Sequence, residues 1–327
     1  MSRISRRPLL RSVLGAALIA AGALCGTAHA QSGKTIKLMV GFPPGGGTDA
    51  IARILAEPLK DALGATVVVD NKPGAGGQIA GQALKAAAPD GTTFFLSHDH
   101  SISILPLVMK NPGYEPAKDF VPVAGFATFV NAFAVSGGTP AKSFNEYVAW
   151  GGKQAKGAVG VPAPASVPEF LVKVIGTKYK LDLVSAPYRG SAPMMADMLG
   201  NQIPAGVASI PDFIENHKAG KLRVVAVLGD KRQAALPDVP TFAELGLAGF
   251  EDMPYYGIFA PAGTPPAEIE RFGAALQKAL ALPDVREKLT NMGLTVGFSS
   301  SQQLAAREAA YAKVWARIIK DSGFVPQ

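Results

Sequence analysis

The chain of 327 residues contains a single cysteine, Cys25, and only 17% of its residues are charged. One cysteine excludes an internal disulfide. The sequence also lacks a G-x-S-x-G turn, an H-E-x-x-H helix and the lysine of a G-x-x-x-x-G-K-[ST] phosphate loop. It therefore carries none of the local signatures of an α/β-hydrolase, a zinc protease or a P-loop nucleotide hydrolase.

The first thirty residues have the composition of an export signal. Four arginines and no acidic residue come first, an apolar run follows over residues 13–24, and Ala28-His29-Ala30 has the small-x-small form of a signal-peptidase site. Because the run is shorter than the ~20 residues of a membrane span, cleavage near Ala30 is predicted in preference to a transmembrane anchor. Arg6-Arg7 followed by leucines leaves the twin-arginine and the general secretory routes both open.

Removal of residues 1–30 would also change the thiol content and the charge. Cys25 would be lost, so that no thiol chemistry remains, and the leucine before it does not fit a lipoprotein site. The formal net charge of +7 falls to +3 without the four arginines. An excess this small, without a long run of lysines, gives no reason to expect a nucleic-acid partner.

Segments of strand and helix character alternate along the rest of the chain. Glycine-rich loops and helical patterns separate the first strands, and this order is typical of α/β proteins with parallel sheets covered by helices. Pro58 is expected to kink or split the first helix, and the last helix is predicted to begin at Ser299. The first three strands are predicted at residues 36–40, 65–70 and 92–97.

The alternation predicts two α/β lobes, each a mostly parallel sheet flanked by helices. The chain is expected to cross between the lobes near residues 129–136 and 250–257. Residues 31–130 and 256–327 would then form the first lobe, and residues 131–255 the second.

A glycine-rich turn, FPPGGGTD, lies between the first predicted strand and the first predicted helix. Consecutive Gly45, Gly46 and Gly47 can direct backbone N–H groups into one small space, and the helix N-terminus adds a partial positive charge. A turn of this kind can bind an anionic oxygen, such as that of a carboxylate, without an arginine or a lysine. The alternative is a tight turn without a ligand, in which Thr48 or Asp49 caps the helix.

Four segments of the chain resemble one protein family and occur in the family's order: VGFPPGGGTDAIARIL (40–55), APYRGSAPMMADMLGNQI (186–203), PDVPTFAELG (237–246) and YYGIFAPAGTPP (255–266). They are similar to the Bug family, the extracytoplasmic solute receptors of tripartite tricarboxylate transporters. The resemblance implies a periplasmic, two-lobed Venus-flytrap protein that binds a small carboxylated molecule between its lobes and delivers it to a membrane permease. It also implies that the turn at residues 42–49 contacts the ligand carboxylate through backbone groups and bridging waters. No cofactor and no enzymatic activity are implied, and we expect a monomer.

The loop after the third strand departs from the family, in which it is usually small and hydroxylated. Ser97 and Ser101 fit that pattern, whereas His98, Asp99 and His100 add bulk and charge. One or both histidines could contact a ligand, could bind a metal with further ligands from elsewhere, or could have no role.

In the second lobe, the resemblance implies ligand contacts from two turns. Pro162, Ala163 and Ser166 lie in a proline-rich turn that is rich in glycine and serine in the family, and Ser166 is a predicted N-cap and hydrogen-bond donor. Tyr188 and Arg189 match an aromatic-basic-glycine turn of the family. A guanidinium group fits a carboxylate, so Arg189 is the candidate charge partner, and a structural ion pair is the alternative.

An aspartate that family members often place near the cleft is missing. Ala208 stands at its position, beside Ser209, and Asp212 lies at a helix start, where capping is the simpler interpretation. The loss weakens the case for an amino-acid ligand, although Asp99 could substitute. The full set of predicted ligand-binding residues is Phe42, Gly45, Gly46, Gly47, Thr48, Asp49, Ser97, His98, Asp99, His100, Ser101, Pro162, Ala163, Ser166, Tyr188, Arg189 and Ser209.

The functional hypothesis is a solute receptor that closes its two lobes on a carboxylate and serves a tripartite transporter. A sensor that presents its loaded form to a signalling partner would use the same fold. A hydrolase is the third class, with Ser97 or Ser101 as the nucleophile beside the His98-Asp99-His100 loop. Adjacent residues of one strand rarely aim at each other, which disfavours that class.

Overall fold

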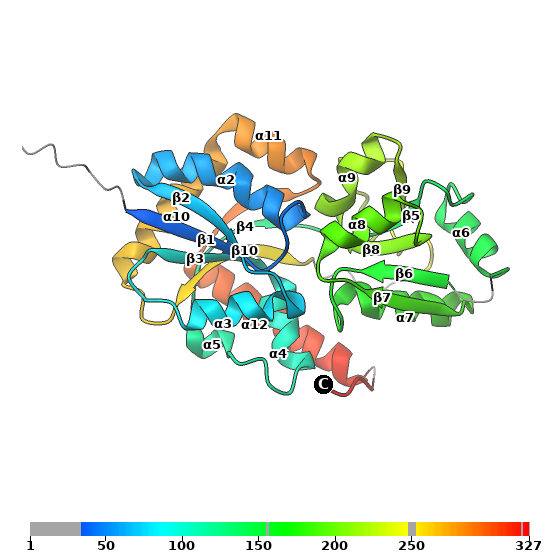
Figure 1. Ribbon diagram of the computed structural model, residues 1–327, viewed down its shortest axis with the longest axis horizontal. Coiled ribbons are helices and arrows are strands. Elements are labelled where there is room, and N and C mark those ends of the chain that lie inside the picture. The colour runs from blue at the N-terminus through cyan, green and yellow to red at the C-terminus, as the bar shows by residue number, and fades with distance from the viewer. Residues whose placement is uncertain (1–33, 155–156, 248–252, 322, 327) are drawn as a thin grey trace, which may run out of the picture. The chain divides into compact units, whose positions relative to one another are not determined.

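The computed structural model describes residues 34–154, 157–247, 253–321 and 323–326 (Figure 1). The predicted export signal lies outside the described residues. Residues 35–327 belong to one compact unit. In the described part of the chain, no helix has both the length and the apolar character that a membrane span requires.

The larger sheet has six strands in the described residues, in the order β11-β4-β10-β3-β1-β2. β1 pairs in parallel with β2 and with β3, as expected from the strand–loop–helix pattern. β10 is antiparallel to β3 and β4, and β11 is antiparallel to β4, so four strands run in one direction and two in the other. The strands are β1 (Thr35–Val40), β2 (Thr66–Asn71), β3 (Thr93–His98), β4 (Phe120–Thr128), β10 (Tyr255–Pro261) and β11 (Thr295–Ser300).

Helices cover both faces of this sheet (Figure 1). Side chains alternate along β1, so Leu38 and Val40 face the core under α2, α10 and α11, whereas Met39 faces the core under α3, α4 and α12. The helices are α2 (Gly47–Leu63), α3 (Gln78–Lys85), α4 (Leu105–Val108), α5 (Pro116–Asp119), α10 (Pro266–Ala281), α11 (Pro283–Asn291) and α12 (Ser301–Asp321), with a 3₁₀ turn η1 (Ala75–Gly77) and a π-helical turn η2 (His100–Ile104).

The second sheet has five strands in the described residues, in the order β7-β6-β8-β5-β9. β6 is parallel to β7 and β8, and β5 is antiparallel to β8 and β9. Phe133 packs on the side of α6 and α7, and Ala132 on the side of α8 and α9. The elements are β5 (Asn131–Ser136), α6 (Phe144–Gly151), β6 (Gly157–Val161), α7 (Val167–Tyr179), β7 (Leu183–Pro187), α8 (Ser191–Leu199), β8 (Ala205–Ser209), α9 (Ile210–Lys218) and β9 (Leu222–Val227).

Two backbone crossings and one helix connect the sheets. The chain passes from β4 to β5 through Phe129 and Val130, and returns from β9 to β10. α12 begins beside β4 and ends against α7 of the second sheet, where Trp315 lies 6.1 Å from Phe170 between ring centroids. The predicted α/β fold with two helix-flanked sheets is confirmed, whereas the lobe boundaries stay a prediction.

One local prediction was wrong, and of the predicted kink or split at Pro58 only the split is contradicted. α12 begins at Ser301, because Ser299 and Ser300 pair with β4 in a strand, β11, that the sequence did not suggest. α2 runs through Pro58 without a break. The missing N–H of Pro58 removes one helical hydrogen bond, and buried Leu55 and Leu59 on either side hold the helix against the sheet.

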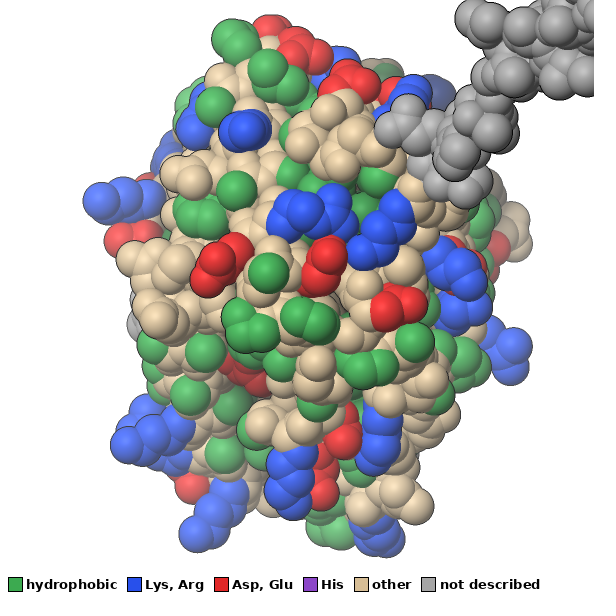
Figure 2. Space-filling view, turned by 90° about the vertical axis from the view of Figure 1, so that its left-hand side faces the viewer, with side chains coloured by type: hydrophobic (Ala, Val, Ile, Leu, Met, Phe, Trp, Pro, Cys, Tyr) green, Lys and Arg blue, Asp and Glu red, His purple; other side chains and the backbone are tan. Residues whose placement is uncertain are grey.

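Figure 2 shows one face of the molecule, on which Lys and Arg side chains are interspersed with Asp and Glu. Several neighbouring charges on the surface form ion pairs, such as Lys60 with Glu57 at 3.0 Å and Arg271 with Glu268 at 2.8 Å. A nucleic-acid interface requires positive charge gathered on one face. The face in Figure 2 does not have it, in agreement with the small net charge expected from the sequence.

Asp49 anchors the glycine-rich turn from within. Asp49 is 3% exposed, and its side chain accepts hydrogen bonds from Gly45 N (2.9 Å), Arg53 Nε (2.9 Å) and Asn71 Nδ2 (3.0 Å). Burial would raise the pKa of Asp49, but the bonds from Arg53, Gly45 and Asn71 together lower it below its ordinary value of 3.8. The carboxylate is therefore a structural anion at the start of α2.

We expect Asp49→Asn to lower the free energy of unfolding by about 1–3 kcal/mol at pH 7, because one of the three donors loses the buried carboxylate oxygen that accepts from it. A lowered folded-state pKa stabilises the protein above the unfolded pKa, and this contribution is lost as the pH falls through the folded value. The variant should therefore lose less stability than the wild type between pH 5 and pH 3. Urea unfolding at both pH values measures this. Asp61→Asn, an exposed position of the same helix, is the control, and an equal acid response in Asp49→Asn and the wild type would contradict the prediction.

Candidate functional site

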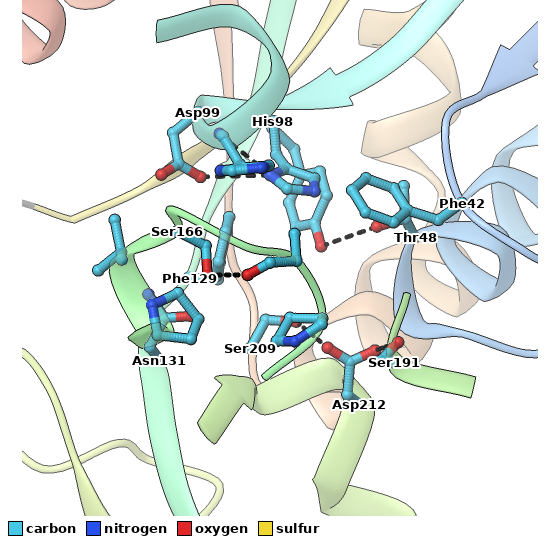
Figure 3. A pocket seen from close by; sticks show the side chains of 16 residues that line it. Phe42, Thr48, His98, Asp99, Phe129, Asn131, Ser166, Ser191, Ser209 and Asp212 are labelled. Carbon is cyan, nitrogen blue, oxygen red and sulfur yellow. Dashed lines mark hydrogen bonds and ion pairs between the residues drawn. The ribbon is translucent and has the colours of Figure 1, made fainter. Parts of the chain in front are cut away.

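A cavity of about 50 Å³ lies where strands of both sheets end (Figure 3). β1, β3 and β4 of the first sheet and β6 and β8 of the second all deliver residues from their carboxyl ends, which is where open α/β sheets bind ligands. The lining residues are Phe42, Thr48, His98, Asp99, His100, Phe129, Asn131, Pro162, Ala163, Ser166, Val167, Pro168, Ser191, Ser209, Asp212 and Tyr256.

Aromatic rings form the first-sheet wall of the cavity. Phe42 stacks on the ring of His98 at 5.1 Å, and Tyr256 meets His98 edge-on at 5.5 Å. This contact follows from the sheet, because Tyr256 and His98 are paired residues of β10 and β3. Phe129 completes the wall, 4.7 Å from Tyr256 between ring centroids. The wall offers a flat apolar surface with a few polar edges.

The His98-Asp99-His100 segment turns from β3 into η2 and places all three residues at the cavity. Asp99 Oδ1 lies 3.3 Å from His98 Nδ1, and Asp99 Oδ2 accepts a hydrogen bond from Tyr311 Oη at 3.0 Å. The same Nδ1 of His98 lies 3.3 Å from the His100 N–H. In one tautomer Nδ1 donates to Asp99, and in the other it accepts from His100, so the tautomer of His98 decides which of the two bonds forms.

His100 is the more buried of the two histidines, at 6% exposure, and its Nδ1 has no hydrogen-bond partner in the described part of the chain. Its ring packs against Gly76, where an added Cβ would lie 2.6 Å from Nε2. Burial, together with the neighbouring charge of His98, lowers the pKa of His100 from 6.5 to about 4. The imidazole is therefore neutral at ordinary pH.

The described residues contain no group of three His, Cys, Asp or Glu side chains that could hold a metal ion. The His98 and His100 rings stack with their centroids 6.5 Å apart. The metal hypothesis for the H-x-H motif thus finds no third ligand in the part of the chain that the structure shows.

We expect His100→Gln to reduce the loss of unfolding free energy that occurs as the pH falls. Because the folded pKa lies below the unfolded one, the unfolded state binds the proton first, so this contribution to stability is complete above pH 6.5 and is lost by pH 4. The shift corresponds to about 3 kcal/mol. Chemical unfolding at pH 7.5 and pH 4.5 should show a smaller loss in the variant than in the wild type. Parallel losses in the two proteins, or an NMR titration of His100 near pH 6.5, would contradict this account.

The second-sheet wall is polar. Ser166 is the N-cap of α7, accepting from Glu169 N at 3.4 Å and donating to Ala163 O at 2.7 Å. Asn131, the first residue of β5, is 4% exposed, and within the described residues its side chain makes no hydrogen bond. A buried amide without a partner at a cavity wall is available to a ligand.

Asp212 joins the two sheets at the opposite side of the cavity (Figure 3). Its Oδ1 accepts from Gly47 N at 2.8 Å and from Ser191 Oγ at 2.5 Å, and its Oδ2 accepts from Ser209 Oγ at 2.5 Å. We refer to these four residues as the Asp212 cluster. The glycine-rich turn therefore does hold a carboxylate in this structure, and that carboxylate belongs to the protein.

The structure brings only part of the predicted set together. Ser101 donates to Gly76 O, Tyr188 donates to Asp197, and Arg189 is exposed. Contacts of these residues with a bound ligand stay a prediction. The predicted residues that line the cavity are Phe42, Thr48, His98, Asp99, His100, Pro162, Ala163, Ser166 and Ser209, and those that do not are Gly45, Gly46, Gly47, Asp49, Ser97, Ser101, Tyr188 and Arg189.

Several lining residues escaped the sequence analysis. Asp212 was interpreted as a helix cap, and its spacing from Ser209 fits that interpretation. Asn131 and Tyr256 lie at the two crossings between the sheets, so polar and aromatic residues at crossings were a usable signal. The lining residues outside the predicted set are Phe129, Asn131, Val167, Pro168, Ser191, Asp212 and Tyr256.

Two helix-flanked α/β sheets with a cavity between their strand ends define a two-lobed solute-binding protein. The family model of the tripartite tricarboxylate transporter family receptor matches residues 51–324. BugT of Bordetella pertussis is 31% identical over 317 residues, 96% of this chain and 97% of BugT. The chain therefore belongs to the tripartite tricarboxylate transporter receptor family, and the resemblance to the Bug proteins is confirmed.

Solved structures agree with this assignment. The periplasmic binding protein BugD has a TM-score of 0.85 and 32% identity, covering 90% of this chain and 99% of BugD. A Rhodopseudomonas palustris protein, Rpa4515, was solved with adipate and has a TM-score of 0.84 and 28% identity, covering 90% of this chain and 98% of its own.

Proposed function

We propose that this protein is a periplasmic receptor that captures a small carboxylate-bearing molecule between its two lobes and delivers it to a tripartite tricarboxylate-type transporter. The observation that carries the proposal is the Asn131 amide, which is buried at the cavity between the sheets and makes no hydrogen bond within the described residues. The adipate-bound relative supports a carboxylate as the ligand class.

In this proposal the ligand carboxylate binds to the Asn131 amide and near the N-terminus of α7. The amide supplies two N–H donors, and the α7 N-terminus at Val167 adds a partial positive charge on the same wall. The rings of Phe42, His98 and Tyr256 would cover the apolar part of the ligand. A carboxylate bound in this way needs no lysine or arginine.

Closure follows from the crossings. Phe129 lies in the first crossing, Asn131 follows it, and Tyr256 follows the second, so a ligand in the cavity touches both connections between the lobes. Ligand binding would select the arrangement in which the lobes meet, with the crossings as the hinge. Export with cleavage near Ala30 and a monomeric state complete the proposal.

A thermal-shift screen of mono-, di- and tricarboxylates, amino acids and aromatic acids tests it. A carboxylate at 100 times its Kd should add about 2.7 kcal/mol to the free energy of unfolding. The same shift is expected with chelator and with added zinc. Asn131→Ala should weaken binding about tenfold, because a ligand oxygen loses its donors, whereas Asn111→Ala at an exposed position should leave it unchanged. No shift with any acid, or a shift that depends on zinc, would count against the proposal.

A further inference from the structure

The charge inside the cavity is unusual for a receptor of polyanions. Asp99 and Asp212 are carboxylates, and the described lining residues include no lysine and no arginine. His100 is neutral because burial lowers its pKa to about 4. A ligand with several negative charges would meet acidic groups without a compensating permanent cation.

The Asp212 cluster occupies the donors that a second ligand carboxylate would use. Gly47 N opens the N-terminus of α2, and Ser191 opens α8, so both helices direct partial positive charge at this point. All the donors named in the cluster bond to Asp212, at 2.5–2.8 Å. Because the N-termini of α2 and α8 already bind the Asp212 carboxylate, they are not available to a carboxylate of the ligand.

Steric contact closes the same position. A Cβ placed on Gly47 would lie 2.9 Å from Asp212 Oδ1 and 3.0 Å from Pro211 Cβ. The α2 N-terminus therefore rests directly against the α9 N-terminus. There is no space between them for another carboxylate while Asp212 is in place.

The hydrogen-bond donor that is available to a ligand carboxylate, the Asn131 amide, lies on the other side of the cavity. Figure 3 shows Asn131 on one side of the cavity and Asp212 with Ser191 on the other. Asn131 makes no side-chain hydrogen bond within the described residues, whereas the oxygens of Asp212 accept from Gly47, Ser191 and Ser209. One end of the cavity can thus receive a carboxylate, and the other already contains one.

We propose that Asp212 determines specificity by supplying the second carboxylate itself, so that this receptor selects ligands with one carboxylate and discriminates against dicarboxylates. The proposal rests on the proposed function, since it concerns the same site. The end of the ligand next to Asp212 is an amide, a hydroxyl or an ammonium group, any of which can donate to its free lone pair. A dicarboxylate would have to bring like charges into contact or displace Asp212 from its donors.

Matched ligand pairs test this directly. Isothermal titration of the purified protein with α,ω-dicarboxylates from malonate to suberate, each beside its monoamide, compares two ends of equal shape and unequal charge. The wild type should bind the best monoamide roughly tenfold or more tightly than the matching dicarboxylate, because like charges in contact are unfavourable. Asp212→Asn keeps the shape and removes the charge, and should bring the pair close to equal affinity.

Asp212→Ala goes further, because it leaves Gly47 N, Ser191 and Ser209 without an acceptor. A dicarboxylate can then supply the missing anion, and we expect the preference to reverse in its favour. Glu215→Gln, an exposed position of the same helix α9 with the same change in charge, is the control and should keep the wild-type preference. Circular dichroism and melting temperature establish that each variant is folded.

The outcomes separate the two proposals. A wild type that binds dicarboxylates as tightly as their monoamides overturns the role of Asp212 and leaves carboxylate capture standing. The same holds if folded Asp212→Asn and Asp212→Ala keep the wild-type preference. If no acid or monoamide binds at all, both proposals fail.

Discussion

Three helix N-termini converge on one carboxylate, and the contact between the two lobes is built around it. α2 contributes Gly47, α8 contributes Ser191, and α9 carries Asp212 itself. Each helix N-terminus has a partial positive charge of about half an elementary charge, so bringing three together without an anion would be unfavourable. Asp212 balances this charge and satisfies donors from both lobes. The Asp212 carboxylate thus occupies the position between the lobes that a bound anion would otherwise take.

The contact between the lobes also explains why glycines occupy this turn. An added Cβ on Gly46 would lie 2.8 Å from Ser191 Oγ, and one on Gly190 would lie 2.6 Å from Pro43 Cδ. Gly190 also has φ +103°, a conformation that residues with a side chain rarely adopt. The glycines on both sides therefore let the two backbones approach closely. In this structure the glycines are required for the contact between the lobes.

Most of the fold could be predicted from the sequence, because strand and helix patterns alternate and the turns between them are marked by glycine and proline. The site was predictable where a strand end fixes the position, as for Phe42 and His98. It was not predictable where a partner lies far away in the chain. Asp212 looks like a local cap, and its bonds to Ser191 and to Gly47, 165 residues earlier, give it another role. Arg189 shows the opposite case, since its chemistry suits a carboxylate but its turn leaves it exposed outside the cavity in this structure, so its contact with a ligand stays a prediction.

Residues that line the cavity are connected to both lobes by two separate routes, the first crossing and α12. Phe129 lies in the short crossing and Asn131 follows it, so the amide at the cavity belongs to the segment that joins the two sheets. Asp99 bonds to Tyr311 of α12, and one helical turn further on Trp315 packs against Phe170 of the second lobe. His98 Nδ1 lies 3.3 Å from Asp99 Oδ1, so the aromatic wall is also in contact with this helix through Asp99. The two routes leave the cavity from different residues, Asn131 on the polar wall and Asp99 beside the aromatic wall.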